Sequence, residues 1–138
     1  MPNPQHDSTT PLVVVGSKTI ALNRTTGAVL WEYKSDEDVW RFLIVGDRLY
    51  LLDVSGDLHC LDLMTGNVHG VVSTGARGAH ALVGDGNRLY IAASRGVILA
   101  HDYAGREIWR NKVDVKMECG LVGLGIPGAI QQPDYSKE

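Results

Sequence analysis

Three pairs of charged and aromatic residues in this sequence have the chemistry of an anion-binding site. Guanidinium groups present planar sets of donors that fit a carboxylate or a phosphate in a bidentate manner. An arginine-rich site with a neighbouring aromatic ring therefore suits a small anionic ligand or a peptide carboxylate. A second interpretation stays open, in which these residues cap strands and pair with one another. The three pairs are Trp40 with Arg41, Arg77 with His80, and Lys116 with Glu118.

Other polar groups form no recognisable metal motif. Asp36, Glu37 and Asp38 offer carboxylate oxygens that suit a hard cation, but the Asp-x-Asp/Asn-x-Asp-Gly spacing of a calcium loop is absent. We interpret this triplet as a solvated acidic loop. The histidines have no His-x-x-x-His spacing, and the sequence predicts no metal site. The four histidines that follow the N-terminal segment are His59, His69, His80 and His101.

The sequence also lacks a recognisable catalytic nucleophile. No Gly-x-Ser-x-Gly motif is present. Gly84-Asp85-Gly86 is predicted to form a hairpin turn rather than a phosphate loop, because it opens no helix. Cys60 and Cys119 fall at different positions of the repeat described below, so we expect two buried, reduced thiols and no disulfide.

Composition excludes several partners. The 138 residues include 13 basic and 16 acidic side chains, and the formal net charge is −3, so no basic surface for nucleic acid or anionic membranes is expected. The N-terminus lacks the basic and apolar regions of a signal peptide, and no apolar stretch reaches the roughly 20 residues of a membrane helix. A cytoplasmic location is therefore expected. Residues 1–10 and 127–138 are polar ends that we expect to be disordered.

The elements that position these residues come from an internal repeat. Gly27, Gly66 and Gly105 lie 39 residues apart. Each follows an Asx residue and precedes a run of β-forming residues, as in a tight hairpin whose glycine accepts a positive φ. The repeated segments are Ala21–Tyr33, Cys60–Val72 and Ala100–Asn111.

Each repeat is predicted to contain four short antiparallel strands, which we name A to D. In the second repeat they are FLIV, LYLLDV, LHCLDL and VHGVV, separated by turns rich in glycine and Asx residues. No stretch sustains the 3.6-residue apolar period of a helix. A period of about 40 residues with four strands is that of a β-propeller blade. The predicted fold is therefore all-β, with three blades over residues 11–126.

The first repeat lacks a strand A, whereas residues 119–125 resemble an isolated strand A after the third repeat. Three blades are fewer than the 4–8 of typical propellers. We expect the strand at 119–125 to join the first blade of a second copy. This would give a six-bladed ring formed by a strand-exchanged homodimer, with no open sheet edge.

The segments between strands C and D resemble the tryptophan-docking repeat of the quinoprotein-like (PQQ-repeat) β-propeller family, whose pattern is approximately Ala-x-Asp-x-x-x-Gly-x-x-x-Trp. The first copy has Ala21, Asn23, Gly27 and Trp31. The third has Ala100, Asp102, Gly105 and Trp109, with one residue deleted before the glycine. The second keeps Asp62 and Gly66, but has Cys60 for the alanine and Gly70 for the tryptophan.

In the dehydrogenases of this family, the resemblance would imply a quinone cofactor and a calcium ion held near a Cys-Cys pair. The sequence has no Cys-Cys pair, so neither PQQ nor calcium is expected here. Scaffold proteins of outer-membrane assembly and sensory domains contain the same repeat without catalysis.

The predicted function is therefore a non-catalytic binding or scaffold module that presents the mouth of its channel to a protein or a small anionic ligand. The alternative is a lyase or hydrolase whose site is assembled across the ring of a dimer. Its candidate residues would be Arg41, Arg77, His80 and Glu118. A third interpretation is that the chain is a fragment of a larger propeller.

Overall fold

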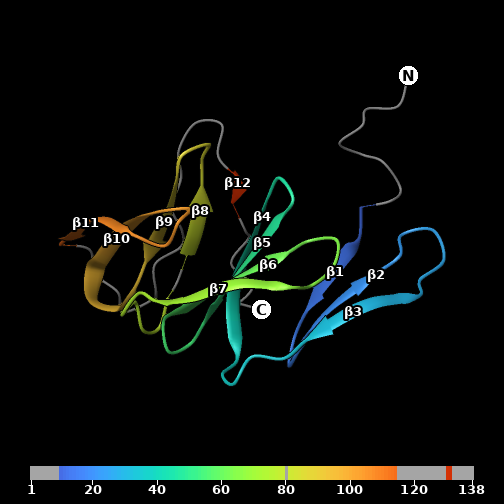
Figure 1. The fold of residues 1–138 in the computed structure, drawn as a ribbon. Coiled ribbons are helices and arrows are strands. Elements are labelled where there is room, and N and C mark those ends of the chain that lie inside the picture. The colour runs from blue at the N-terminus through green and yellow to red at the C-terminus, as the bar shows by residue number, and fades with distance from the viewer. Residues whose placement is uncertain (1–9, 80, 115–129, 132–138) are drawn as a thin grey trace.

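The computed structural model describes residues 10–79, 81–114 and 130–131, which form three antiparallel sheets (Figure 1). The first sheet contains β1 (Leu12–Val15), β2 (Thr19–Leu22) and β3 (Val29–Tyr33). The second contains β4 (Val39–Val45), β5 (Arg48–Asp53), β6 (Asp57–Asp62) and β7 (Val68–Ser73). The third contains β8 (Ala81–Gly84), β9 (Arg88–Ala92), β10 (Val97–Asp102), β11 (Glu107–Lys112) and β12 (Ile130–Gln131). The prediction of an all-β fold is confirmed.

Apart from β12, consecutive strands are neighbours within each sheet, and the orders are β1-β2-β3, β4-β5-β6-β7 and β11-β10-β9-β8-β12. The first sheet thus has three strands, equivalent to B, C and D, and the other two begin with a strand A. The expected closing strand at residues 119–125 lies outside the described residues. The short strand β12 pairs instead with the inner edge of β8, in a segment that the sequence places in the C-terminal tail.

Turns between strands C and D are built alike in all three sheets. The side-chain oxygen of Asn23 accepts hydrogen bonds from two backbone amides of its turn, and Asp62 and Asp102 do the same. These amide donors hold the pKa of Asp62 and of Asp102 below the usual range of a carboxyl group. Gly27 and Gly66 have φ angles of 77° and 76°, which glycine adopts without a steric penalty.

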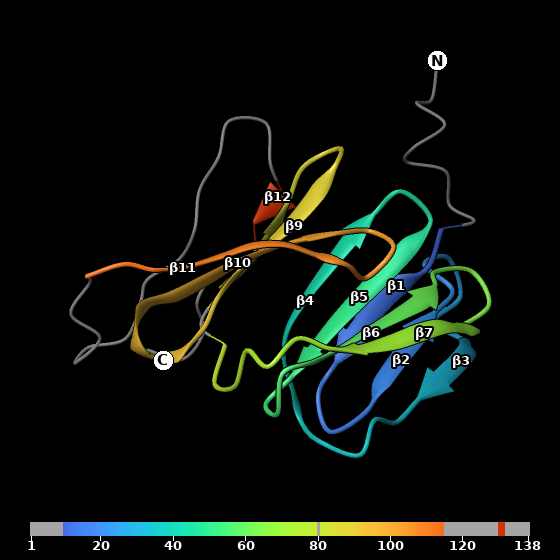
Figure 2. The same cartoon turned by 60° about the vertical axis from the view of Figure 1, so that its left-hand side comes forward.

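The three sheets follow one another and bury apolar side chains at their two contacts (Figure 2). Between the first and second sheets, Trp31 packs with Leu49 and Leu61. Between the second and third sheets, Leu43 and Leu89 are both fully buried in a larger cluster. Within the described residues, no helix has the length and hydropathy needed to cross a membrane.

Trp31 docks the first sheet onto the second. Its Nε1 donates a hydrogen bond of 3.0 Å to the carbonyl of Leu63. Its ring lies so close to Gly66 that a Cβ added there would be 2.5 Å from Cδ2 of the indole. Gly66 is therefore required twice, by its positive φ and by the contact with the ring. Trp109 is the equivalent residue of the third sheet, yet it is 41% exposed.

His101 on β10 is a polar residue inside the third sheet. It is 2% exposed, and neither ring nitrogen has a hydrogen-bond partner among the described residues. Burial lowers its pKa below the usual value of histidine, against a smaller opposing effect of Glu107. Leu22 and Leu61 occupy the corresponding positions of the first two sheets. The third sheet therefore has a titratable group where its neighbours have apolar ones.

Replacing Trp31 with alanine removes a buried ring and a hydrogen bond. We expect the free energy of unfolding to fall by about 3–5 kcal/mol, measured by urea denaturation followed by far-UV circular dichroism. Trp40→Ala is the matched control, since Trp40 is 52% exposed, and it should change stability by about 0.5 kcal/mol or less. Equal losses in both variants would contradict a docking role for Trp31.

Replacing His101 with leucine should make the protein less sensitive to acid. Because the folded-state pKa of His101 is lowered, the unfolded chain binds an extra proton at mildly acidic pH. Stability from the neutral ring is complete well above the ordinary pKa of about 6.5 and is lost as the pH falls below it. Thermal unfolding between pH 7.5 and 5 should show a smaller decrease in Tm for His101→Leu than for the wild type. An unchanged pH dependence would contradict this assignment.

Candidate functional site

One end of the three sheets collects the loops that join strand D to strand A and the turns that join strand B to strand C. Main-chain hydrogen bonds link them in series, because Val54 N donates to Asp38 O (2.9 Å) and Gly78 N donates to Val54 O (3.2 Å). Ser94 N continues the series by donating to Arg77 O (3.3 Å). We call this surface the D–A face and define it by residues 34–38, 54–56, 74–79 and 93–96.

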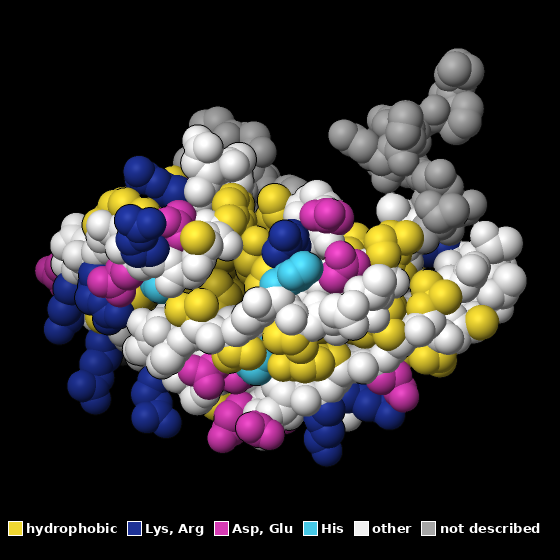
Figure 3. Space-filling view, in the orientation of Figure 1, with side chains coloured by type: hydrophobic (Ala, Val, Ile, Leu, Met, Phe, Trp, Pro, Cys, Tyr) yellow, Lys and Arg dark blue, Asp and Glu magenta, His cyan; other side chains and the backbone are white. Residues whose placement is uncertain are grey.

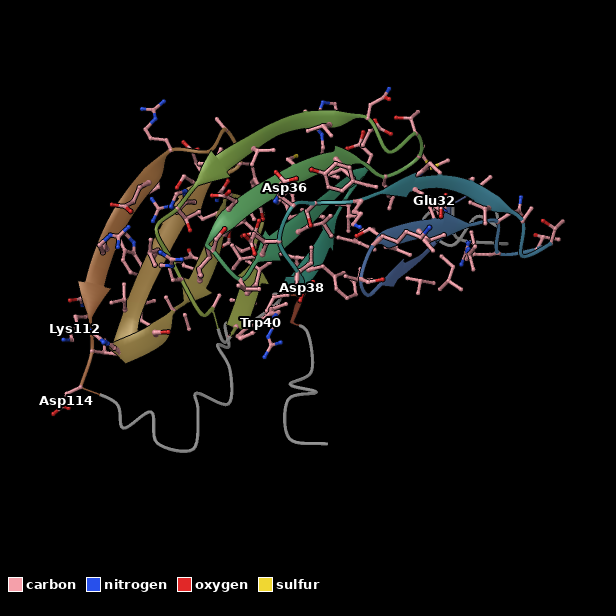
Figure 4. The ribbon with its side chains drawn as sticks, turned by 90° about the horizontal axis from the view of Figure 1, so that it is seen from below. Glu32, Asp36, Asp38, Trp40, Lys112 and Asp114 are labelled. Atoms are coloured by element: carbon pink, nitrogen blue, oxygen red, sulfur yellow. The ribbon has the colours of Figure 1, made fainter. Side chains whose placement is uncertain are left out.

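The structure tests only part of the predicted anion site, because His80, Lys116 and Glu118 lie outside the described residues. Trp40, at the start of β4, is 52% exposed, and Figure 4 shows it just beyond the loop that contains Asp36 and Asp38. Arg41 is half-buried, and its Nη1 donates a 2.8 Å hydrogen bond to the carbonyl of Trp40. Arg77 is exposed on the D–A face.

Arg77 shares a hollow with two arginines that the sequence analysis did not select. The hollow has a volume of about 370 Å³ and is lined by Arg77, Arg95 and Arg110, together with Ser94 and short or apolar neighbours. Trp40 and Arg41 are not among its lining residues. In the space-filling view, Lys and Arg side chains gather toward the end of the molecule that the third sheet forms (Figure 3).

The three arginines differ in how firmly they are held. Arg110 Nη2 donates to the carbonyl of Thr74 (2.9 Å) and to Glu107 Oε1 (2.8 Å), and this hydrogen bond lowers the pKa of Glu107. The guanidinium groups of Arg77 and Arg95 make no hydrogen bond or ion pair with the part of the chain that the structure describes. Two positive charges in the hollow are thus uncompensated by the described chain.

Arg95 also has an unusual backbone. Its φ of 63° makes it the one described residue other than glycine with a positive φ, a conformation that costs about 1–3 kcal/mol for such residues. Strain of this kind tends to occur at functional sites. Aligning the B-to-C turns of the second and third repeats would have drawn attention to Arg95, because Ser55 precedes the glycine in the second repeat.

A buried polar network supports the D–A face from below. Asp53 accepts hydrogen bonds from the backbone amides of Ser55 and Asp57, and His59 Nε2 lies 2.9 Å from its Oδ2. The hydroxyl oxygen of Tyr33 lies 2.7 Å from His59 Nδ1, within hydrogen-bond distance. Burial opposes ionisation of Asp53, but the hydrogen bonds from His59 and Ser55 prevail and lower its pKa. The network joins the first two sheets and fixes the turn after Asp53.

The acidic triplet lies on the same face as the arginines. Asp36, Glu37 and Asp38 are all exposed, in agreement with a solvated loop. Across residues 10–79, 81–114 and 130–131, no three His, Cys, Asp or Glu side chains are grouped as a metal site would require. The D–A face therefore has an acidic loop beside the first sheet and a basic hollow beside the third.

These features define the class of protein. Three successive sheets of antiparallel strands, docked by a tryptophan and repeated every 39 residues, are blades of a β-propeller. The family described as outer membrane protein assembly factor BamB matches residues 15–123, and this chain belongs to it. The predicted PQQ-repeat family is thereby confirmed. Among curated proteins, none matches the chain.

Solved structures show the same fold. BamB from Moraxella catarrhalis is 28% identical with a TM-score of 0.63, over 75% of this chain and 34% of that one. A europium-containing methanol dehydrogenase is 15% identical with a TM-score of 0.61, over 73% and 23%. BBS1N in complex with ARL6DN is 16% identical with a TM-score of 0.64, over 75% and 36%. The chain thus spans about a quarter to a third of the length of these proteins.

Proposed function

We propose that this chain is a non-catalytic scaffold module that binds an acidic group of a protein partner on its D–A face. The observation that carries the proposal is the arginine hollow, in which the guanidinium groups of Arg77 and Arg95 form no ion pair with the described residues. Guanidinium groups bind carboxylates bidentately. A chain terminus or an acidic side chain of a partner would supply such a carboxylate.

Relatives support a role in protein assembly. The matching family is described as an assembly factor for outer membrane proteins, and the similar BBS1N structure was determined in complex with ARL6DN. The D–A face offers the rigid platform that such a role requires, because the series of main-chain hydrogen bonds and the Asp53 network hold its loops.

We further propose that two copies close a six-bladed ring through the contact that Trp31 makes within one chain. Trp109 is 41% exposed and lies beside Tyr90, with 6.2 Å between the ring centroids. In the first blade, a Cβ added to Gly27 would meet no atom of the described residues within 4 Å. An exposed docking ring and an open glycine turn are complementary, so Trp109 of one copy would pack on Gly27 of the next. Two such contacts related by a two-fold axis close the ring.

Reversing charge in the hollow should abolish partner binding. The double variant Arg77→Glu, Arg95→Glu would be compared with the wild type in affinity capture from cell extract, with quantitative mass spectrometry of the bound proteins. Arg106→Glu is the matched control, because Arg106 is an exposed arginine on a C-to-D turn. We expect a protein that the wild type and the control retain and that the double variant loses about ten-fold or more, since a charge-paired contact contributes about 1.5–3 kcal/mol. Equal retention by all three proteins would refute the assignment of the site.

The ring predicts a sedimenting mass of twice the 15.0 kDa of one chain. Sedimentation velocity at micromolar concentration should detect this dimer for the wild type. Trp109→Arg should produce monomer, because an arginine cannot fill the turn at Gly27 and adds an unpaired charge. A wild-type monomer would refute the ring while leaving the arginine hollow untouched.

A further inference from the structure

The contact between the second and third blades lacks its docking tryptophan. Gly70 stands at the position of Trp31 and Trp109. In each blade this position pairs across the sheet with a residue of strand C, and the pairs are Ala21 with Trp31, Cys60 with Gly70, and Ala100 with Trp109. A small residue thus faces each indole, whereas the blade without an indole has the larger cysteine. The second blade therefore has no indole at this position, and the larger side chain of Cys60 replaces only part of the indole's volume.

A pocket of about 210 Å³ remains at this contact. Cys60 and Gly70 line it from the second blade, and Tyr103 and Gly105 line it from the C-to-D turn of the third blade. An engineered apolar cavity of about 150 Å³ holds benzene, so this pocket has room for a flat aromatic ring. Tyr50 forms a further wall, with its ring centroid 5.4 Å from that of Tyr103.

The neighbouring contact shows how an indole fits such a place. There the ring of Trp31 covers Gly66, and its Nε1 donates to the carbonyl of Leu63. In the turn of the third blade, Gly105 occupies the position of Gly66, and Tyr103 occupies the position of Leu63. Val72 takes up part of the space, because a Cβ added to Gly105 would be 2.6 Å from Cγ2 of Val72. Val72 thus lies against Gly105 as Trp31 lies against Gly66, and the remaining pocket is open beside Val72, where the same turn lines it.

Polar side chains at the pocket favour an aromatic ligand as well. Arg48 and His69 both line it, and their side chains are 43% and 38% exposed. The Nη1 of Arg48 lies 3.8 Å from the sulfur of Cys60, which places the guanidinium beside the space left by the missing ring. A cation near an aromatic face stabilises it, most strongly for an indole.

We propose that this pocket binds an indole ring, either a free indole compound or the tryptophan side chain of another protein. The ring would replace the docking tryptophan that the second blade lacks, between Cys60 and Gly70 on one side and the turn at Tyr103 on the other. The proposal does not depend on the arginine hollow, which shares no lining residue with this pocket.

Two-dimensional ¹H–¹⁵N NMR of the full chain tests the proposal, with free indole and N-acetyl-tryptophanamide as probes. We expect at least one probe to cause saturable shifts of the amides of Gly70, Ala104 and Gly105, with a roughly millimolar Kd. Shifts with indole alone would indicate a free ligand, and shifts with the blocked amino acid would indicate a side chain. Failure of both probes to cause saturable shifts at these amides would overturn the proposal.

A second experiment fills the pocket with a tryptophan side chain of the protein itself. The double variant Cys60→Ala, Gly70→Trp recreates the Ala–Trp pair of the other blades, so it should weaken probe binding about ten-fold or more and raise the Tm. Val71→Trp is the matched control, because Val71 is 50% exposed and points to the other face of β7. It should bind the probe like the wild type. Unchanged binding by a folded double variant would also overturn the proposal, and Gly70→Trp alone serves the same test if the double variant does not fold.

Discussion

The indole of Trp31 is the large side chain at the centre of the contact between the first two sheets, which apolar neighbours and the hydrogen bond between Tyr33 and His59 complete. Its ring is buried against Gly66, and its one polar atom is satisfied by the carbonyl of Leu63. A sheet of three or four strands has one face that must be covered to be stable in water, and the next sheet covers it here. The alignment of the blades, and therefore of their loops, depends on such contacts. Where the ring is present the contact is filled, and where Gly70 replaces it a pocket remains.

The same contact explains the two exposed ends of the array. In the proposed ring, Trp109 and the turn at Gly27 would form the contact that Trp31 and Gly66 form within the chain. An exposed aromatic ring and an open glycine turn leave apolar surface in contact with water, which is unfavourable. Association through this contact would cover both, and the arginine hollow would then be one of two equivalent sites.

The loops of the D–A face are held by hydrogen bonds to one another and to the strands beneath them. Hydrogen bonds from Val54, Gly78 and Ser94 connect consecutive turns, and the Asp53–His59 pair stabilises the turn beneath them. Because the backbone is held in this way, Arg95 can occupy a strained conformation. The backbone at Arg77 and Arg95 is thus held before any ligand arrives, and this lowers the part of the entropic cost of binding that comes from ordering these loops.

The sequence by itself determined the blades. Turn glycines at a fixed interval, and Asx side chains whose local hydrogen bonds do not depend on distant residues, were sufficient to predict the strands and the family repeat. It also selected Arg77 and Trp40 as candidate ligand-binding residues. Tertiary structure alone decided which residues share a site. Arg95 and Arg110 lie in different strands and turns from Arg77, so only the docking of strands within the third sheet, and of that sheet on the second, brings the three together. The pocket at Gly70 could not be predicted from the sequence either, because the absence of a side chain leaves a pocket only where a neighbouring blade encloses the space.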